Sequence, residues 1–189
     1  MRRKAIAREL ALLAQSNEAP AGMLVRDLIG MGRFAHEGWF TSGTGEDQRQ
    51  IADAMRIMDV ASFADRRVGE LSGGQLQRCR MAMTLAQDAN ILLLDEPTNN
   101  LDLNYQYALL DVARQQAKAG RAVVAVLHDL TQASLYADRI ILMDRGGIVA
   151  DGSPGEVLTV ERVEAVYGIR TTSTQIGRAV VLLPESALP

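Results

Sequence analysis

The chain has 189 residues, of which 48% are hydrophobic and 23% charged, and its formal net charge is −3. This balance is that of a globular domain large enough to bury a core, and it excludes disordered and fibrous chains. The acidic balance gives no reason to expect nucleic acid or anionic lipid as a direct partner. The single cysteine, Cys79, cannot form an internal disulfide, so we expect a reducing compartment and a small buried side chain.

The apolar runs of the sequence are too short to span a membrane. The longest, residues 91–94 and 122–127, fall far below the ~20 residues that a membrane-spanning helix needs. Residues 1–4 are basic, as at the start of a signal peptide, but Arg8 and Glu9 interrupt the apolar stretch that should follow. We therefore expect neither a membrane span nor export.

Hydrophobic spacing predicts a strand over Leu10–Leu13 and two helices in the first third of the chain, over residues 23–34 and 48–60. The methionines of the second helix are expected to fill core space. Between the helices, residues 36–47 hold three glycines and Trp39, which is typical of a loop anchored by its tryptophan. The residues expected on the packed face of the first helix are Met23, Leu24, Leu28 and Met31.

The second half of the chain alternates helical and strand patterns. A helix over residues 103–119 should end before Gly120, a natural terminator. The turn residues 145–147 predict a β-hairpin, and Ser153 followed by Pro154 and then Glu156 predicts a helix start. The other expected elements are strands over 123–127, 139–144 (buried), 148–150 and 179–183, a short helix over 131–137, and a helix ending at Gly168.

A helix start that suits phosphate lies at Ser72. Ser72 followed three residues later by Gln75 is a capping-box pattern, which predicts a helix beginning near Gly73. Backbone N–H groups point outward at such a start, and Gly73 and Gly74 carry no Cβ, so an anion can approach closely. The helix dipole favours negative charge there by about 0.3–1 kcal/mol. An isolated Ser-Gly-Gly is more often an ordinary turn, so the rest of the sequence must decide.

Two carboxylates follow a predicted buried strand. Residues 91–94 form a continuous apolar run between turn-prone residues, which is typical of a strand buried on both faces of a parallel sheet. Asp95 and Glu96 come at its carboxyl end, where open parallel sheets bind ligands. An aspartate for a metal beside a potential general base suits hydrolysis of a phosphoanhydride, although such a pair also commonly caps a surface strand. The strand over 123–127 shows the same arrangement, an apolar run followed by a polar residue, with His128 at its carboxyl end.

In this order, these segments resemble four motifs of ATP-binding-cassette (ABC) ATPases: the signature, the Walker B motif, the D-loop and the H-loop. The matching segments are LSGGQLQR at residues 71–78, ILLLDEP at 91–97, NNLD at 99–102 and LHD at 127–129. Residues 12–15 also resemble the Q-loop of the family, and residues 140–155 its strand–turn–strand, so the resemblance covers nearly the whole chain.

The resemblance implies an α/β fold, a P-loop NTPase-like cassette with a parallel core sheet flanked by helices and an inserted helical subdomain. Residues 1–189 are then expected to form one partial cassette domain. Its parts would be a helical subdomain and loops over 16–70, a core with the motifs over 71–158, and a C-terminal helix and strand over 159–189.

The resemblance also assigns roles to residues. In the family, two cassettes pair head to tail around two ATP molecules. The catalytic residues are then expected to be Glu96 as general base, His128 at the γ-phosphate and Gln15, with Mg²⁺ held by Asp95 and Gln15. The residues expected to bind nucleotide are Ser72, Gly73, Gly74, Gln75 and Asp102.

One motif of the family has no match. The family holds ATP through a Gly-rich P-loop that ends in Gly-Lys-Ser or Gly-Lys-Thr upstream of the Q-loop. The two lysines here are Lys4, followed by alanine, and Lys118, also followed by alanine. We therefore expect a cassette without its N-terminal strands and P-loop, inactive alone. Because the family places the P-loop strand between the strands expected over 123–127 and 139–144, both should expose an unpaired edge.

A finer resemblance points to the ATPase subunits of bacterial iron–siderophore importers. It rests on Gly32-Arg33-Phe34 and on residues 98–102, 127–130 and 163–168. It implies an ATP-hydrolysing subunit at the cytoplasmic face of the cell membrane. The implied partners are a second cassette, transmembrane permease subunits and, indirectly, a substrate-binding protein, with no nucleic acid. The alternatives that stay open are haem or cobalamin import, a soluble non-transport ABC ATPase, and a truncated non-functional product.

Overall fold

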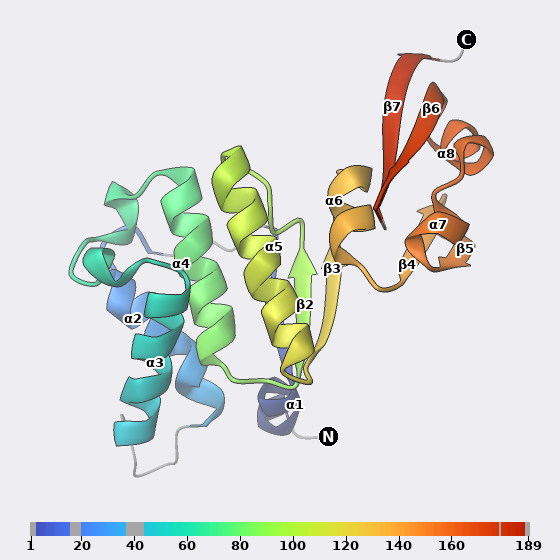
Figure 1. Cartoon of the computed structure of the whole chain (residues 1–189). Helices are drawn as coiled ribbons and strands as arrows, with labels where there is room; N and C mark the ends of the chain where they lie inside the picture. Colours follow the sequence, from blue (N-terminus) through green and yellow to red (C-terminus); the bar gives the residue numbers. More distant parts are fainter. Residues whose placement is uncertain (1–2, 16–19, 37–43, 178, 188–189) are drawn as a thin grey trace. The chain divides into compact units, whose positions relative to one another are not determined.

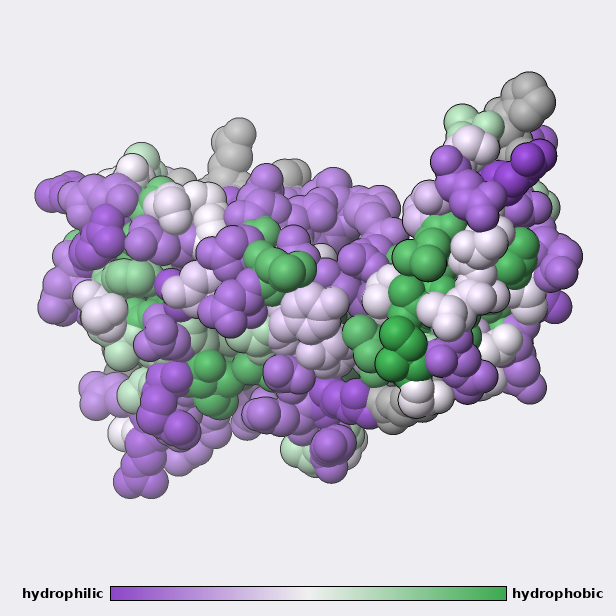
Figure 2. All heavy atoms as spheres, turned by 45° about the horizontal axis from the view of Figure 1, so that its top comes forward, coloured by the Kyte–Doolittle hydropathy of each residue, from purple (hydrophilic) through white to green (hydrophobic). Residues whose placement is uncertain are grey.

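The computed structural model describes residues 3–15, 20–36, 44–177 and 179–187. The chain divides into two compact units, Met1–Val126 and Leu127–Pro189 (Figure 1). Hydrophobic side chains reach the surface in separate groups among hydrophilic ones (Figure 2). Within the described ranges, no helix is long and apolar enough to cross a lipid bilayer.

The first unit is built on a parallel sheet of three strands in the order β1-β2-β3. The strands are β1 (Leu10–Leu13), β2 (Ile91–Asp95) and β3 (Ala122–Val126). Their register places Leu12 beside Leu93 and Leu93 beside Val124. Parallel neighbours need long crossover connections, and here helices supply them. Strand β1 confirms its prediction, and β3 begins and ends one residue earlier than expected.

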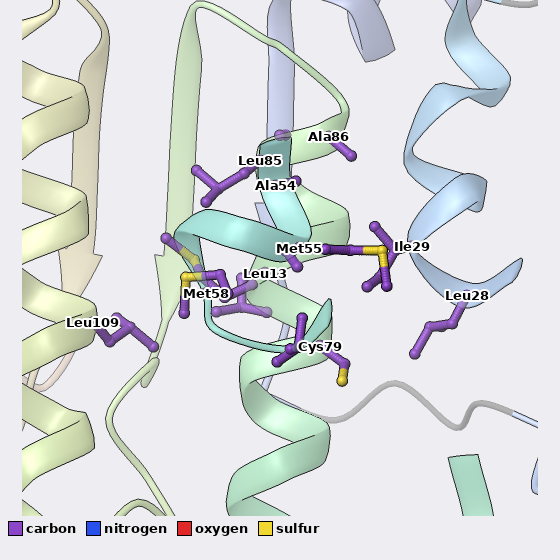
Figure 3. Packing of buried hydrophobic residues seen from close by; sticks show 14 of the residues in the cluster. Leu13, Leu28, Ile29, Ala54, Met55, Met58, Cys79, Leu85, Ala86 and Leu109 are labelled. Carbon is purple, nitrogen blue, oxygen red and sulfur yellow. The ribbon is translucent and has the colours of Figure 1, made fainter. Parts of the chain in front are cut away.

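Helices of the first unit gather on one face of this sheet, where α4 and α5 lie alongside β2 (Figure 1). Core side chains from β1, from α4 and from the helices around it meet in Figure 3, among them Leu13, Met55, Cys79 and Leu109. The helices are α1 (Arg3–Glu9), α2 (Val25–Gly30), α3 (Gly45–Ile57), α4 (Gly73–Ala86) and α5 (Leu103–Lys118), with short 3-10 turns at Met31–Ala35, Ala61–Phe63 and Val68–Glu70.

The expectation that β2 is buried on both faces is wrong. Leu92 and Leu94 are 0% and 1% exposed and face the helices, whereas Ile91 is 36% exposed and Leu93 is only half-buried. The cause is the one-sided arrangement of α4 and α5, which leaves the other face of the sheet open within the described structure. Strand β2 therefore has one core face and one open face.

Two helix predictions need correction. Helix α3 begins at Gly45 rather than at residue 48, because Thr44 and Asp47 form a capping box that the loop prediction overlooked. The helix expected over residues 23–34 is α2 followed by a 3-10 turn, and Met31 is 38% exposed. Its buried face is Val25, Leu28 and Ile29. Trp39 lies outside the described residues.

Among its described residues, the second unit contains two antiparallel hairpins and three short helices. The expected hairpin turn is confirmed by positive φ angles of 48° at Arg145 and 80° at Gly146, and Gly168 ends α8 with φ 64°. The elements are α6 (Leu130–Tyr136), β4 (Ile140–Asp144), β5 (Gly147–Gly152), α7 (Pro154–Val157), α8 (Val160–Tyr167), β6 (Ile169–Ile176) and β7 (Ala179–Ala187).

Strand β4 is not the buried strand that the sequence predicts. Leu142 is 5% exposed, but Ile141 and Met143 on the other side are 52% and 56% exposed, since the small core of this unit covers one side only. Strand β6 was not predicted, because its middle is polar. Within the described residues β3 pairs only with β2, and β4 only with β5, so the expectation of an unpaired edge on each strand is confirmed.

Candidate functional site

The turn before α4 has the local structure that its sequence predicts. The Ser72 hydroxyl accepts a hydrogen bond from the Gln75 N–H at 3.3 Å, and the Gln75 side-chain carbonyl accepts one from the Ser72 N–H at 3.0 Å. Helix α4 therefore begins at Gly73, as predicted. The N–H groups of its first turn have no carbonyl partner inside the helix and present partial positive charge at its end.

A cleft of about 590 Å³ opens at this helix end. Ser72, Gly73, Gly74 and Gln75 line one part of it, so four of the five predicted nucleotide-binding residues lie together. The fifth, Asp102, lines the same cleft from the start of α5. Its carboxylate also accepts a hydrogen bond from the Tyr105 N–H at 3.1 Å and so caps α5.

The glycines leave room in the cleft. A Cβ built on Gly73 would have Asn100 Cβ as its nearest neighbour, at 3.9 Å, and one on Gly74 would lie 3.4 Å from the Asn100 carbonyl and from a Leu101 methyl. A larger side chain at Gly74 would therefore press against the segment before α5. The open helix end and the bare backbone fit a phosphate group.

Arg78 is a cleft residue that the sequence analysis did not assign. Its guanidinium lies 4.1 Å from the ring centre of Tyr105, and its Nη1 donates to the Asp59 carbonyl at 3.1 Å. The residue is 6% exposed, and its buried Nε has no hydrogen-bond partner among the described residues. The only signal in the sequence was its place at the end of LSGGQLQR. This cation adds positive charge to a wall of the cleft.

A second group of polar residues forms at the carboxyl end of β2. The side-chain amide of Gln15 donates to Glu96 Oε2 at 2.6 Å, and the Asn99 side-chain amide donates to the same oxygen. Glu96 has a φ of 48°, so its backbone turns sharply after the strand. The structure thus brings together two of the predicted catalytic residues, and it adds Asn99, which the motif NNLD contained without an assigned role.

Asp95, the predicted metal residue, is the last residue of β2 and is half-buried. No group of three or more histidine, cysteine or acidic residues comes together within the described ranges. Mg²⁺ needs no such group, because it binds through one or two oxygen ligands and completes its shell with phosphates and water. The Asp95 carboxylate and the Gln15 amide oxygen are ligands of that kind.

His128, the third predicted catalytic residue, belongs to the second unit and is exposed between β3 and α6. The next residue, Asp129, caps α6 by accepting hydrogen bonds from the N–H groups of Thr131 and Gln132 at 2.7 and 3.0 Å. Because His128 and Glu96 lie in different units, only the sequence motif associates them.

Comparison with known proteins identifies the family. The profile of the ABC transporter family matches residues 1–99. The chain belongs to this family. A solved ABC transporter in an inward-facing conformation superposes with a TM-score of 0.82 and 25% identity, covering 94% of this chain and 72% of that one. The predicted fold class, an α/β cassette with a parallel sheet and helices, is therefore confirmed.

Curated ABC relatives share more sequence. The ferric enterobactin transport ATP-binding protein FepC of Escherichia coli is 42% identical over 168 residues, which are 88% of this chain and 62% of FepC. The hemin import ATP-binding protein HmuV of Rhodococcus jostii is 41% identical over 183 residues, which are 95% of this chain and 62% of HmuV. The chain thus spans less than two thirds of the length of these relatives.

Proposed function

We propose that this chain is part of the ATP-hydrolysing subunit of an ABC importer for ferric chelates. The observation that carries the proposal is the hydrogen bond from Gln15 to Glu96 at the carboxyl end of β2, in a chain whose α4 also begins with an intact signature turn. The names of FepC and other siderophore transport relatives support the substrate class.

The residues at the carboxyl end of β2 and those of the cleft before α4 have different roles in this proposal. Glu96 accepts the proton of the water that attacks the γ-phosphate, and Gln15 orients that carboxylate and the water. Asp95 and Gln15 would hold Mg²⁺, which would supply charge neutralisation at the phosphates. The cleft formed by Ser72, Gly73, Gly74 and Arg78 binds the nucleotide of a second cassette. His128 contacts the γ-phosphate by motif match.

Two cassettes and a pair of permease subunits complete the assembly at the cytoplasmic face of the membrane, with a substrate-binding protein acting indirectly. A dimeric bacterial ABC transporter cassette is among the solved structures with this fold, with a TM-score of 0.70. Within the proposed assembly, this chain contributes the helical subdomain with residues 16–70, the core with residues 71–158 and the C-terminal part with residues 159–189. Because residues 1–189 contain no P-loop motif, we expect this polypeptide alone neither to bind ATP tightly nor to hydrolyse it.

The test is a chimera in which the part of FepC outside the matched region is joined to this chain. We expect the chimera to hydrolyse ATP, and residues 1–189 alone to bind no fluorescent ATP analogue with Mg²⁺. A folded chimera that binds ATP without turnover would contradict the assignment of Glu96. Micromolar binding by the chain alone would show that phosphate is held by other means.

The substrate class has its own test. In a strain without FepC, the chimera should restore growth on ferric enterobactin. Relatives with haem import in their names make haem the second candidate. Growth on haem iron through a haem permease, without growth on ferric enterobactin, would favour that candidate instead.

A further inference from the structure

Two guanidinium groups and two aromatic rings alternate beside the cleft at the start of α4. The Arg66 guanidinium lies 5.4 Å from the ring centre of Phe63. The Arg78 guanidinium lies 5.6 Å from the same ring centre and 4.1 Å from that of Tyr105. Each distance is within the roughly 6 Å over which a ring face attracts a cation. These four side chains, which we call the cation–ring ladder, join the segment before α4, α4 itself and α5.

Arg78 is the centre of the ladder because its charge is buried without a buried counter-ion. Its side chain is 7% exposed, whereas the Asp59 carboxylate 3.5 Å away belongs to a side chain that is 93% exposed, so water screens that pair. A buried cation needs other compensation, which here comes from backbone carbonyls and the ring faces. The contact with Tyr105 should be the strongest of the ladder. It is shorter than the contact between Arg66 and Phe63, and the Arg66 side chain is 39% exposed.

The ladder connects two sides of the cleft. Arg78 lies on the second turn of α4 and Tyr105 on the first turn of α5, and both side chains line the cleft. The Tyr105 N–H donates to the Asp102 carboxylate at 3.1 Å, so the residue that carries the ring also holds Asp102. At the other end of the ladder, Arg66 Nη2 donates to the Glu70 carbonyl at 2.6 Å, directly before the signature turn. A shift of either ring would therefore alter the separation between Asp102 and that turn.

We propose that Tyr105 and Phe63 are positioning residues of the nucleotide cleft and act through Arg78. In the proposed function, on which this rests, the cleft binds the nucleotide of a second cassette. The two rings hold the guanidinium and so fix the start of α5 and the segment before α4 relative to the signature turn. The separation between Asp102 and the signature turn is then set before the nucleotide arrives. Such preorganisation lowers the free-energy cost of binding.

A double-mutant cycle in residues 1–189 tests the ladder without nucleotide. Arg78→Met removes the charge but keeps a long side chain, Tyr105→Leu removes the ring, and urea unfolding is measured for each variant and for the double variant. Because coupled side chains have non-additive effects, Tyr105→Leu should change the unfolding equilibrium constant at least about threefold less when Arg78 is already methionine. The matched control combines Tyr105→Leu with Arg49→Met. Arg49 lies on α3 outside the ladder with a side chain that is 79% exposed, so these two effects should add.

ATP turnover by the FepC chimera tests the positioning role. Tyr105→Leu should raise the KM for ATP about fivefold and leave kcat within about twofold, because a cleft that is no longer preorganised binds substrate and transition state equally less well. Tyr105→Phe keeps the ring and should retain the KM of the unchanged chimera. Phe63→Leu should raise KM less, since its ring lies farther from Arg78. Tyr107→Leu, the same substitution on α5 outside the lining of the cleft, is the control and should change neither constant.

Additive effects of Arg78→Met and Tyr105→Leu would overturn the proposal, because the ladder would then contribute no coupling. So would a fall in kcat at constant KM in Tyr105→Leu, since that pattern indicates fewer folded molecules rather than a misplaced cleft. A KM raised equally in Tyr105→Phe and Tyr105→Leu would overturn it too, because the hydroxyl group and not the ring would be responsible. A chimera that shows no turnover in its unchanged form would count against the proposed function, and the cycle in residues 1–189 would still decide whether the ladder exists.

Discussion

The Gln15 side-chain amide donates to Glu96 at 2.6 Å although the two residues are 81 positions apart in the chain. The parallel pairing of β1 with β2 produces this contact, because Leu13 lies beside Leu94 and both strands end at the same edge of the sheet. Gln15 and Glu96 each lie two positions after this pair of residues. The contact therefore depends on strand register, and a shift of register would separate the pair.

Replacing Glu96 by glutamine should abolish catalysis in the FepC chimera. The amide keeps the shape of the side chain but cannot accept the proton of water, and loss of a general base typically costs about 10²–10⁴-fold in rate. Steady-state phosphate release measures the effect. Glu185→Gln, on the exposed end of β7, is the control and should leave turnover unchanged. Near-normal turnover in Glu96→Gln would remove Glu96 from the mechanism.

Gly32→Ala should destabilise the chain. A Cβ at residue 32 would lie 2.3 Å from the Met83 carbonyl oxygen and 3.2 Å from the Gln87 backbone nitrogen, so the 3-10 turn would have to move away from α4. Overpacking of this kind costs about 1–3 kcal/mol in the free energy of unfolding. Urea unfolding measures it. Gly45→Ala, where nothing lies within 4 Å, should change stability by less than about 1 kcal/mol. Equal effects of the two substitutions would refute this explanation.

The success of the sequence predictions differs between local and long-range features. The capping box at Ser72 and the turn glycines at residues 146 and 168 depend on a few neighbouring residues, and the structure confirms them. The prediction that Ile91 and Ile141 are buried was wrong. An apolar run indicates that a strand tends to be buried, but it does not show whether another element packs against that strand. Strand β6 was missed, since its middle residues are polar and lack that signal.

The candidate site divides in the same way. The capping pattern predicted the helix start at residues 72–75, and the resemblance to ABC ATPases implied the roles of Gln15 and Glu96. The fold brings each group together. Arg78 was missed because its role depends on the ring of Tyr105 in another helix, and no local pattern indicates that contact. The role of His128 stays a prediction, because it lies in the second unit.

The thiol of Cys79 should react slowly in the folded chain. Cys79 is 0% exposed, and burial raises its pKa from 9.0 to about 11, so the thiolate fraction at pH 8 falls about a hundredfold before any effect of restricted access. Reaction with a disulfide reagent at pH 8, with and without guanidinium, measures this difference. A Cys79→Ala/Ser173→Cys variant places the thiol on exposed β6 and should react rapidly without denaturant. A fast native reaction at Cys79 would show that the α4 core opens readily.

Asp47→Asn should destabilise the chain at neutral pH and much less in acid. Asp47 Oδ1 accepts a hydrogen bond from Arg33 Nε at 2.8 Å, and both side chains are under 10% exposed, at 8% and 6%. The hydrogen bonds from Thr44 and from Arg33 lower the pKa of Asp47 below its ordinary 3.8. The stabilisation that this carboxylate contributes is therefore fully present above pH 3.8 and is lost as the pH falls through the lower pKa of the folded state.

Removing one partner of a buried ion pair costs about 3–5 kcal/mol, so Asp47→Asn should lose stability on that order at pH 7, with Arg33 left uncompensated. The difference from the unchanged chain should then shrink as the pH is lowered from 4 toward 2, since the Asp47 carboxyl of the unchanged chain takes up a proton. Urea unfolding at a series of pH values measures it. The control is Asp53→Asn on the same helix, whose partner Arg56 is 73% exposed; it should cost under about 1 kcal/mol at every pH. If the difference in the free energy of unfolding between Asp47→Asn and the unchanged chain stays constant down to pH 2, the variant loses stability through altered packing and not through the lost charge.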